Sequence, residues 1–314
     1  MSFRNDGQFP VSHISLASIL SHYSINDFSY SLADGGIENT TCIIQAPEQT
    51  YALRIYRQAK KPLAAIKCEL LYMSALRSQG LPVPTVYTNQ HESAITQAHV
   101  NDQNWEALLM EYMLGQHPSG YTSALISQMA QAQAPMHLIG EAFDRPNNVV
   151  PHPTKLVESE FVHRVDQDKL DNKKLLDYIE RIVKYEVILD KELPLGYSHF
   201  DFDSGNILVD SNGHLSAILD FDDLQYSPLV VCLGYTLWSI LYETRSENLI
   251  LRYMAEYQKN RRLCQLEQQF LPKVMLFRHY VITALKVLNG HTAQADVQKY
   301  EDVEKQIILL IEEQ

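Results

Sequence analysis

The chain has 314 residues, with 26 lysines and arginines against 38 aspartates and glutamates, so its formal net charge is −12. This length allows one large domain or two ordinary ones with a sizeable core. The basic residues occur at most in pairs, whereas phosphate-backbone binding depends on clustered cations. We therefore expect no nucleic-acid partner.

The cysteine spacing argues against a cysteine metal site, and the hydrophobic segments argue against membrane insertion. The four cysteines have no C-x-x-C or zinc-like spacing and are expected to be reduced core thiols. The first residues lack the apolar stretch of a secretory signal, and the most hydrophobic segment, residues 229–242, is too short to span a bilayer. We expect a buried helix there and a cytoplasmic protein without membrane contact, while the oligomeric state is not predicted.

Strand patterns dominate the first third of the chain. Residues 40–44 and 51–56 are two such runs, separated by turn-forming residues at 46–49. A helix follows, with apolar residues at helical spacing between Ala65 and Leu76, and it is expected to stop near Gly80. Residues 93–96 and 105–110 predict two further strands.

Helical periodicity dominates from residue 114 onward, interrupted only between His199 and Asp223. The pattern predicts an α+β, bilobal fold. Residues 1–113 form a small antiparallel-sheet lobe, residues 114–314 form a larger, mainly helical lobe, and a hinge lies near residues 111–116. Ligands are expected in a cleft between such lobes.

The most informative segment reads HFDFDSGN at 199–206 and is followed by DFD at 220–222. Between them, two apolar runs flank Asn212-Gly213, a strong hairpin signal. With a two-residue loop, Asn206 faces Leu219, next to Asp220. With a three-residue loop beginning at Ser211, Asn206 pairs with Ile218 instead, and Asp220 is its diagonal neighbour. Either register brings two oxygen donors together at the open end of the hairpin.

This arrangement suits phosphoryl transfer. Mg²⁺ takes one or two protein ligands and completes its shell with water and phosphate oxygens, so Asn206 and Asp220 suffice. Asp201, across a tight turn, is placed to accept the proton of a substrate hydroxyl. His199 is expected to support this turn by a backbone hydrogen bond. Asp203 is left open between a turn residue and a second metal or substrate contact.

Three further groups of residues are candidates for ligand contacts. Arg54 on a strand and Glu69 on the next helix can pair, with Arg54 reaching nucleotide phosphates, and the backbone at Gly35 and Gly36 can approach phosphates. An acceptor ammonium group could be bound by the carboxylates and rings of Asp222, Asp223, Trp238 and Tyr242. Trp238 and Tyr242 also fit an ordinary helix core, and Asp222 an ordinary turn residue or metal contact.

These residues resemble the aminoglycoside phosphotransferase/choline kinase-like family, whose members share the protein-kinase-like fold. The resemblance rests on HFDFDSGN and DFD, with support from 35–39, 53–57, 80–84, 110–112 and 136–137. It implies ATP as the phosphate donor, with GTP left open, and Mg²⁺. It also implies Asp201 as catalytic base, Asn206 and Asp220 as metal ligands, and Arg54, paired with Glu69, at the position of the phosphate-contacting lysine. Residues 1–113 would be the nucleotide-binding lobe, with backbone groups from Glu111 to Met113 receiving the base.

The chain departs from the family pattern at two positions. Arg54 replaces the lysine, and Cys232 stands where the family usually has an aspartate that braces the catalytic loop. Our leading hypothesis is transfer of the ATP γ-phosphate to a hydroxyl of a small amine-bearing molecule. The two departures motivate a nucleotide-binding pseudokinase or regulatory module as the second hypothesis. A metal-dependent phosphoester hydrolase using His199, Asp201 and Asp203 is the third, and the acceptor remains open among aminoglycosides, homoserine, choline and other amino alcohols.

Overall fold

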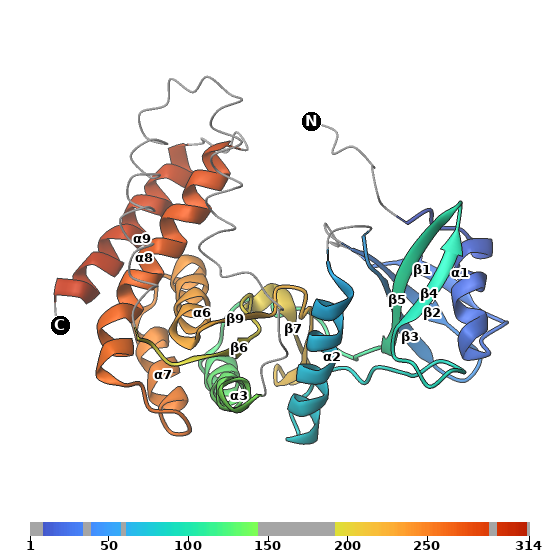
Figure 1. The fold of residues 1–314 in the computed structure, drawn as a ribbon. Helices are drawn as coiled ribbons and strands as arrows, with labels where there is room; N and C mark the ends of the chain where they lie inside the picture. The colour runs from blue at the N-terminus through green and yellow to red at the C-terminus, as the bar shows by residue number, and fades with distance from the viewer. Residues whose placement is uncertain (1–8, 34–38, 58–60, 144–191, 289–293, 313–314) are drawn as a thin grey trace. The chain divides into compact units, whose positions relative to one another are not determined.

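The computed structural model describes residues 9–33, 39–57, 61–143, 192–288 and 294–312. The chain separates into two compact units, Met1–Leu114 and Gly115–Gln314 (Figure 1). The first unit is built on one antiparallel sheet and the second is mainly helical, as the pattern of strand and helix signals predicted. No helix in the described part of the chain combines the length and apolarity that crossing a bilayer requires.

The sheet of the first unit has five antiparallel strands in the order β1-β2-β3-β5-β4. Their bounds are β1 (Ser29–Leu32), β2 (Thr40–Gln45), β3 (Thr50–Ile55), β4 (Thr96–Val100) and β5 (Gln103–Glu111). The predicted strand at 93–96 is wrong by several residues, since β4 begins only at Thr96. The Asn89 side chain accepts hydrogen bonds from the backbone of His91 and Ser93 and so holds the preceding residues in a turn.

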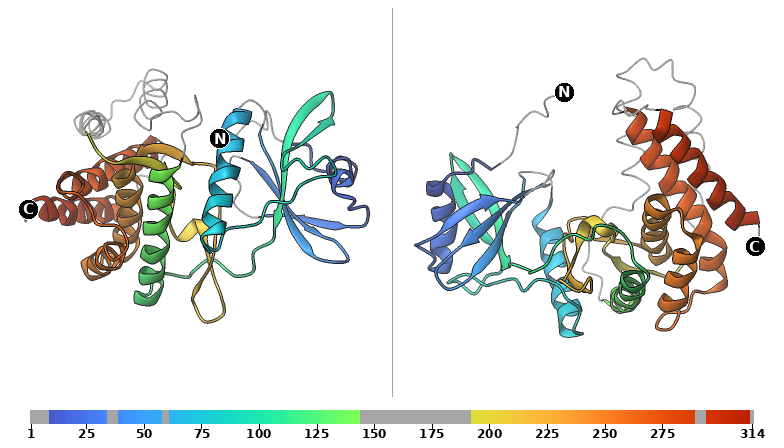
Figure 2. Two further views of the ribbon diagram at one scale, coloured as in Figure 1. Left: turned by 60° about the horizontal axis from the view of Figure 1, so that its bottom comes forward. Right: turned by 180° about the vertical axis from the view of Figure 1, so that it is seen from behind.

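Two helices cover opposite faces of this sheet. One core joins α1 (His13–Leu20) to Leu53 and Ile55 of β3, and another joins α2 (Leu63–Ser78) to Leu108 and Met110 of β5 (Figure 2). Because side chains alternate along a strand, Arg54 points to the face opposite that of Leu53 and Ile55, which is the face covered by α2.

The second unit consists of helices around two short hairpin-like ribbons. Its helices are α3 (Ser123–Ala142), α6 (Leu229–Thr244), α7 (Glu247–Tyr257), α8 (Gln265–Leu288) and α9 (Gln294–Glu312). In one ribbon β6 (Leu195–Ser198) pairs with β9 (Gln225–Pro228), and in the other β7 (Ile207–Val209) pairs with β8 (Leu215–Ile218). The predicted non-helical region, 199–223, is therefore too short, because β6 and β9 extend it to 195–228.

Close backbone packing fixes the strand that leads into the HFDFDSGN segment. Gly140 of α3 lies so near β6 that a Cβ there would come within 1.8 Å of the Tyr197 carbonyl oxygen. Only glycine allows the helix to approach the strand this closely. The predicted helix over 229–242 is confirmed as α6, which is almost entirely buried. Of the four cysteines, Cys264 is exposed, contrary to the expected core position, because it precedes the amphipathic helix α8.

Candidate active site

The hairpin combines the two registers considered from sequence. Asp210 pairs with His214 around a three-residue loop, Ser211 to Gly213, and the Asp210 side chain accepts from the backbone N–H groups of Asn212 and His214. Gly213 has a φ of +78°, the left-handed conformation that ends such a loop. An irregularity between Leu208 and Val209 then shifts the pairing by one residue. The open end consequently has the two-residue-loop register.

This shift sets the neighbours of the predicted metal ligands. Ile207 pairs with Ile218, and the Leu219 N–H donates to the Asn206 carbonyl oxygen at 2.8 Å. Asp220 therefore follows directly after the residue paired with Asn206. The structure brings the two predicted oxygen ligands to the same end of the hairpin, as the sequence pattern predicted.

Asp201 is held by side chains from two elements. The Asn206 Nδ2 group donates to the Asp201 carbonyl oxygen at 2.8 Å and to its Oδ2 at 3.0 Å. On the other side, Arg278 Nη2 of α8 lies 3.3 Å from Oδ1. The carboxylate remains 35% exposed, so a substrate hydroxyl could still reach it. A base must be both oriented and accessible, and Asp201 meets both conditions.

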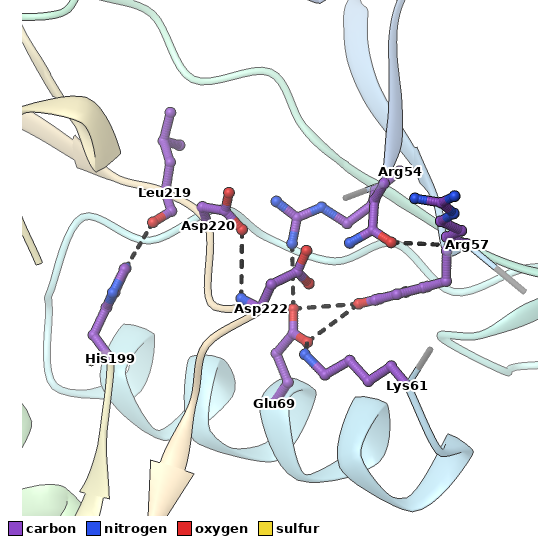
Figure 3. Close-up of polar contacts among 10 residues, drawn as sticks. Arg54, Arg57, Lys61, Glu69, His199, Leu219, Asp220 and Asp222 are labelled. Carbon is purple, nitrogen blue, oxygen red and sulfur yellow. Dashed lines mark hydrogen bonds and ion pairs between the residues drawn. The ribbon is translucent and has the colours of Figure 1, made fainter. Parts of the chain in front are cut away.

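His199 connects the Asp201 segment to the Asp220 segment. Its Nε2–H donates to the Leu219 carbonyl oxygen at 2.7 Å, as Figure 3 shows. The ring is fully buried, and burial lowers the pKa of His199 against the opposing effects of the Leu219 carbonyl and nearby carboxylates. The hydrogen bond predicted from sequence is thus present. It joins a residue two positions before Asp201 to the residue just before Asp220.

Two non-glycine residues in this region have a left-handed backbone. Phe200 has a φ of +70° and Asp220 a φ of +58°. Such conformations cost on the order of 1–3 kcal/mol each and cluster at functional sites, where they aim a side chain that a relaxed backbone would misdirect. Here they immediately precede Asp201 and coincide with Asp220.

The turn that follows Asp201 has its own set of partners. Asp203 Oδ1 accepts from the Gly205 N–H at 2.8 Å, and the Tyr121 hydroxyl accepts from the Ser204 N–H at 2.9 Å. Burial, reinforced by the nearby charge of Asp201, raises the pKa of Asp203. Burial likewise raises the pKa of Tyr121 to about 12. Of the two roles left open for Asp203, this geometry favours the turn residue.

The donor set at the hairpin end fits a hard divalent cation. Because the Asn206 amide nitrogen is committed to Asp201, the amide oxygen is the group that Asn206 can offer a metal. Amide and carboxylate oxygens are the ligands that Mg²⁺ prefers. Among the described residues, no group of three or more histidines, cysteines or acids could hold a metal ion. The hydrolase alternative proposed such a cluster at His199, Asp201 and Asp203, and the described residues do not form one there.

Arg54 and Glu69 form the predicted ion pair in the first unit. Arg54 Nη1 lies 3.5 Å from Glu69 Oε1, and the Glu69 side chain is only 1% exposed (Figure 3). The same carboxylate accepts from Lys61 Nζ and from the Tyr56 hydroxyl. One buried carboxylate thus orients two cations that come from β3 and from the segment before α2. An acid buried this deeply needs such partners to remain ionised.

The predicted base-binding segment lies at the end of β5. The Glu111 N–H donates to the Thr85 carbonyl oxygen, and the Glu111 carboxylate accepts from the Thr85 N–H and hydroxyl and lies 3.3 Å from Arg77. Although burial opposes them, these contacts lower the pKa of Glu111. These contacts engage the Glu111 N–H and carboxylate, and base binding by the backbone from Glu111 to Met113 stays a prediction. Gly35 and Gly36 lie outside the described residues.

The predicted substrate residues fall into two environments. Asp222 and Asp223 follow Asp220 at the hairpin end, and the Asp222 N–H donates to Asp220 Oδ1 at 3.4 Å (Figure 3). Trp238 and Tyr242 stack on each other in α6, with ring centroids 5.0 Å apart. Trp238 is buried, which fits the helix-core alternative.

The Tyr242 ring is surrounded by cations of this chain. Lys299 Nζ lies 3.9 Å from the ring centroid, and Lys286 Nζ lies 4.6 Å from it and 2.9 Å from the hydroxyl. Burial opposes the effect, but the contacts of Lys286, Tyr300 and Lys299 lower the pKa of Tyr242. A substrate ammonium group at this ring would have to compete with these lysines.

Several residues that contact the predicted site residues or their turn were not predicted from the sequence. Arg278, whose guanidinium lies 4.4 Å above the Tyr235 ring, reaches Asp201 from 77 positions along the chain. Thr236, which donates to the Phe202 carbonyl oxygen, stands in a helix with no polar pattern to mark it. Of these residues, only Lys61 carried a sequence signal, as part of a basic pair, and this signal was weak.

Comparisons with known proteins assign the chain to a class and to a family. The model of the phosphotransferase enzyme family matches residues 29–266, which is most of the chain. A search of curated proteins found no match. Among solved structures, a microcompartment-associated aminopropanol kinase is 19% identical, with a TM-score of 0.74 over 95% of this chain and 96% of that one. The amicoumacin kinase hAmiN, in complex with AMP-PNP, Ca²⁺ and Ami, is 14% identical, with a TM-score of 0.73 over 93% and 92%. A choline kinase from Cryptosporidium parvum Iowa II is 13% identical, with a TM-score of 0.59 over 91% and 89%.

The fold is therefore that of the protein-kinase-like small-molecule kinases, and the chain is a small-molecule phosphotransferase. It belongs to the phosphotransferase enzyme family. The family resemblance inferred from the HFDFDSGN and DFD motifs is thereby confirmed.

Proposed function

We propose that this enzyme transfers the γ-phosphate of ATP to a hydroxyl group of a small amine-bearing molecule, with Asp201 as the catalytic base. The observation that carries the proposal is the hydrogen-bonded connection among its three central residues. Asn206 holds the Asp201 carboxylate, pairs through its backbone with Leu219, and so adjoins Asp220. Asp201 accepts the hydroxyl proton as the oxygen attacks, which makes that oxygen a better nucleophile.

We assign Asn206 and Asp220 as the ligands of Mg²⁺ in this proposal. When bound, Mg²⁺ supplies positive charge that neutralises the phosphate oxygens during transfer. The chain's own contribution is to hold these oxygen atoms in place, through the β7–β8 pairing and through the His199 bond to Leu219. The hAmiN complex contains a nucleotide analogue and a divalent cation, which is consistent with this assignment.

The first unit is proposed to hold the nucleotide. Arg54, fixed by the buried Glu69 carboxylate, would contact phosphate oxygens, for which its planar fork is suited. The Glu111 carbonyl and the backbone of Met113 would receive the base. In this proposal residues 1–113 bind the nucleotide. Residues 114–314 provide the catalytic base, Asp201, and bind the acceptor.

We assign the acceptor amine to carboxylates rather than to the Tyr242 ring. Asp222 and Asp223 lie directly after the proposed metal ligand and carry the charge that an ammonium group requires. The Tyr242 ring already faces two lysines. The names of the aminopropanol and choline kinases support an amine-bearing acceptor for this chain.

The test is a screen of ATP consumption with Mg²⁺ over amino sugars, amino alcohols and hydroxy amino acids, with products identified by ³¹P NMR. We expect a phosphate ester of at least one class, and we expect Asp201→Asn to lower kcat by roughly 10²- to 10⁴-fold, the usual scale for loss of a general base. ATP binding without any phosphorylated product would favour the pseudokinase hypothesis. Turnover by Asp201→Asn at the wild-type rate would reject the assignment of the base.

A further inference from the structure

A buried chain of hydrogen bonds reaches the catalytic turn from three helices. The Tyr253 hydroxyl of α7 donates to Gln133 Oε1 of α3 at 2.8 Å, and Gln133 Nε2 donates to Thr236 Oγ1 of α6 at 2.8 Å. The Thr236 hydroxyl then donates to the Phe202 carbonyl oxygen at 2.9 Å. Phe202 is the residue after Asp201. We call this sequence of donors, Tyr253, Gln133 and Thr236, the relay.

The direction of donation is the same at each step. Thr236 Oγ1 accepts from Gln133 with a lone pair and has one hydroxyl proton to donate to a carbonyl oxygen. Two carbonyls lie in reach, that of Phe202 at 2.9 Å and that of Cys232 on the same helix at 3.2 Å. The shorter contact is the one to the turn. At the start of the relay, burial raises the pKa of Tyr253 well above its usual value. Its hydroxyl therefore keeps the proton that it donates to Gln133.

The relay is buried and uncharged. Gln133 and Tyr253 have no exposed surface and Thr236 is 1% exposed, so water does not compete for these bonds. Cys232, one helical turn before Thr236, is also neutral, because burial raises the pKa of its thiol to about 11. Gln133 Nε2 lies 3.5 Å from the Cys232 sulfur, which is a weak acceptor. The strong, short contact with the turn is therefore made by the Thr236 hydroxyl.

We infer that Thr236, oriented by Gln133 and Tyr253, is a positioning residue that fixes the backbone carrying Asp201. The inference rests on the proposed role of Asp201 as the base. Thr236 contacts the backbone one residue after Asp201, whereas the Cys232 thiol contacts the backbone of Phe200, one residue before it. The strained Phe200 backbone explains why support is needed, since a residue held at a φ of +70° relaxes when its neighbours are released.

The main variant is Thr236→Val, which keeps the shape and removes the hydroxyl. Thr236→Ser restores the hydroxyl, and Gln133→Met disturbs the relay from its other side without altering Thr236. The matched control is Thr283→Val, because Thr283 of α8 is equally buried and its hydroxyl donates to a carbonyl oxygen away from the turn, that of His279, at 2.7 Å. Thermal unfolding of all four variants reports the loss of stability common to such substitutions.

The first readout is amide hydrogen exchange of the peptide covering 199–206 in the full chain. We expect Thr236→Val to speed exchange there about tenfold. Thr236→Ser should exchange like the wild type, and Thr283→Val should leave this peptide unchanged. Equal protection of the peptide in the wild type and in Thr236→Val would overturn the inference, whether or not any acceptor has been identified.

The second readout is steady-state turnover with Mg·ATP and 1-amino-2-propanol as the probe acceptor. Loss of positioning lowers kcat, here by roughly 10- to 100-fold for Thr236→Val, while KM for ATP changes less than about twofold. Thr236→Ser should recover most of the rate, and Gln133→Met should lose about three- to tenfold. An unchanged kcat in Thr236→Val would refute the positioning role. A wild-type enzyme inactive with every acceptor would instead refute the proposed function and leave the exchange result to decide the inference.

Discussion

Replacing His199 with phenylalanine tests whether the Asp201 and Asp220 segments depend on one hydrogen bond. The substitution keeps a planar ring in a fully buried position but removes the Nε2–H that donates to the Leu219 carbonyl oxygen at 2.7 Å. A fully buried carbonyl left without its donor costs about 1–3 kcal/mol, and the loss for the part-buried Leu219 carbonyl is expected toward the low end of this range. Leu219 also pairs with Asn206 and precedes Asp220, so the loss is felt at both proposed metal ligands.

We expect two effects on activity from His199→Phe. Movement of the Leu219–Asp220 backbone weakens the cation site, so the Mg²⁺ concentration for half-maximal turnover rises about three- to tenfold, and misalignment with Asp201 lowers kcat by roughly 10- to 100-fold. His199→Gln is the matched control, because its amide can donate from about the position of Nε2. This variant should recover a large part of both losses.

The assay is turnover as a function of Mg²⁺ at saturating ATP, with the unfolding free energy measured in urea for each variant. A His199→Phe enzyme with wild-type kcat and wild-type Mg²⁺ dependence would refute the reasoning, because the two segments would then hold their geometry without the bond. Equal losses in the phenylalanine and glutamine variants would also contradict it, since ring packing rather than the donor would be responsible.

Three further predictions concern other parts of the molecule. Lys61→Met removes an ammonium group from the buried Glu69 carboxylate of α2 and should raise KM for ATP about three- to tenfold in steady-state kinetics. Lys67→Met, on the exposed side of α2, should leave KM for ATP unchanged. Burial lowers the pKa of His137 well below 6.5, so the unfolded chain binds this proton at a higher pH than the folded chain does. The unfolding free energy therefore falls as pH drops below about 6.5, by up to about 1.4 kcal/mol per pH unit. Urea unfolding between pH 7 and 5 should show a shallower fall for His137→Gln, and an identical slope would contradict this. Gly115→Ala should destabilise the second unit by about 1–3 kcal/mol, because φ is +145° and a Cβ would lie 2.6 Å from a side-chain oxygen of β8. Gly120→Ala, in open space, should change its melting temperature little.

The parts of the site that could be predicted are those encoded locally. Asn206 precedes the first strand of one hairpin and Asp220 follows its second strand, so alternation and turn residues were enough to predict that they meet at the open end. The exact loop was not predictable in the same way. It depends on the Asp210 side chain bonding its own turn and on an irregularity after Leu208, which hydrophobic pattern alone does not encode.

The residues that surround Asp201 from a distance could not be predicted. Arg278 and Thr236 reach the turn from helices whose packing is decided by tertiary contacts, and neither belongs to a local motif. Strand β1 was missed because all four of its residues are exposed and show no buried face. Strands β6 and β9 were missed because each is only four residues long, too short for a periodic signal.

The central claim is that Asn206 and Asp220 bind the divalent cation while Asp201 serves only as the base. It is tested most directly by Mn²⁺ binding, followed by electron paramagnetic resonance, in the presence of AMP-PNP. We predict that Asn206→Ala and Asp220→Asn each weaken Mn²⁺ binding at least about tenfold. Asp201→Asn should bind Mn²⁺ within about twofold of the wild type and yet lose turnover. Equal weakening of Mn²⁺ binding by Asp201→Asn and Asp220→Asn would contradict this division of roles.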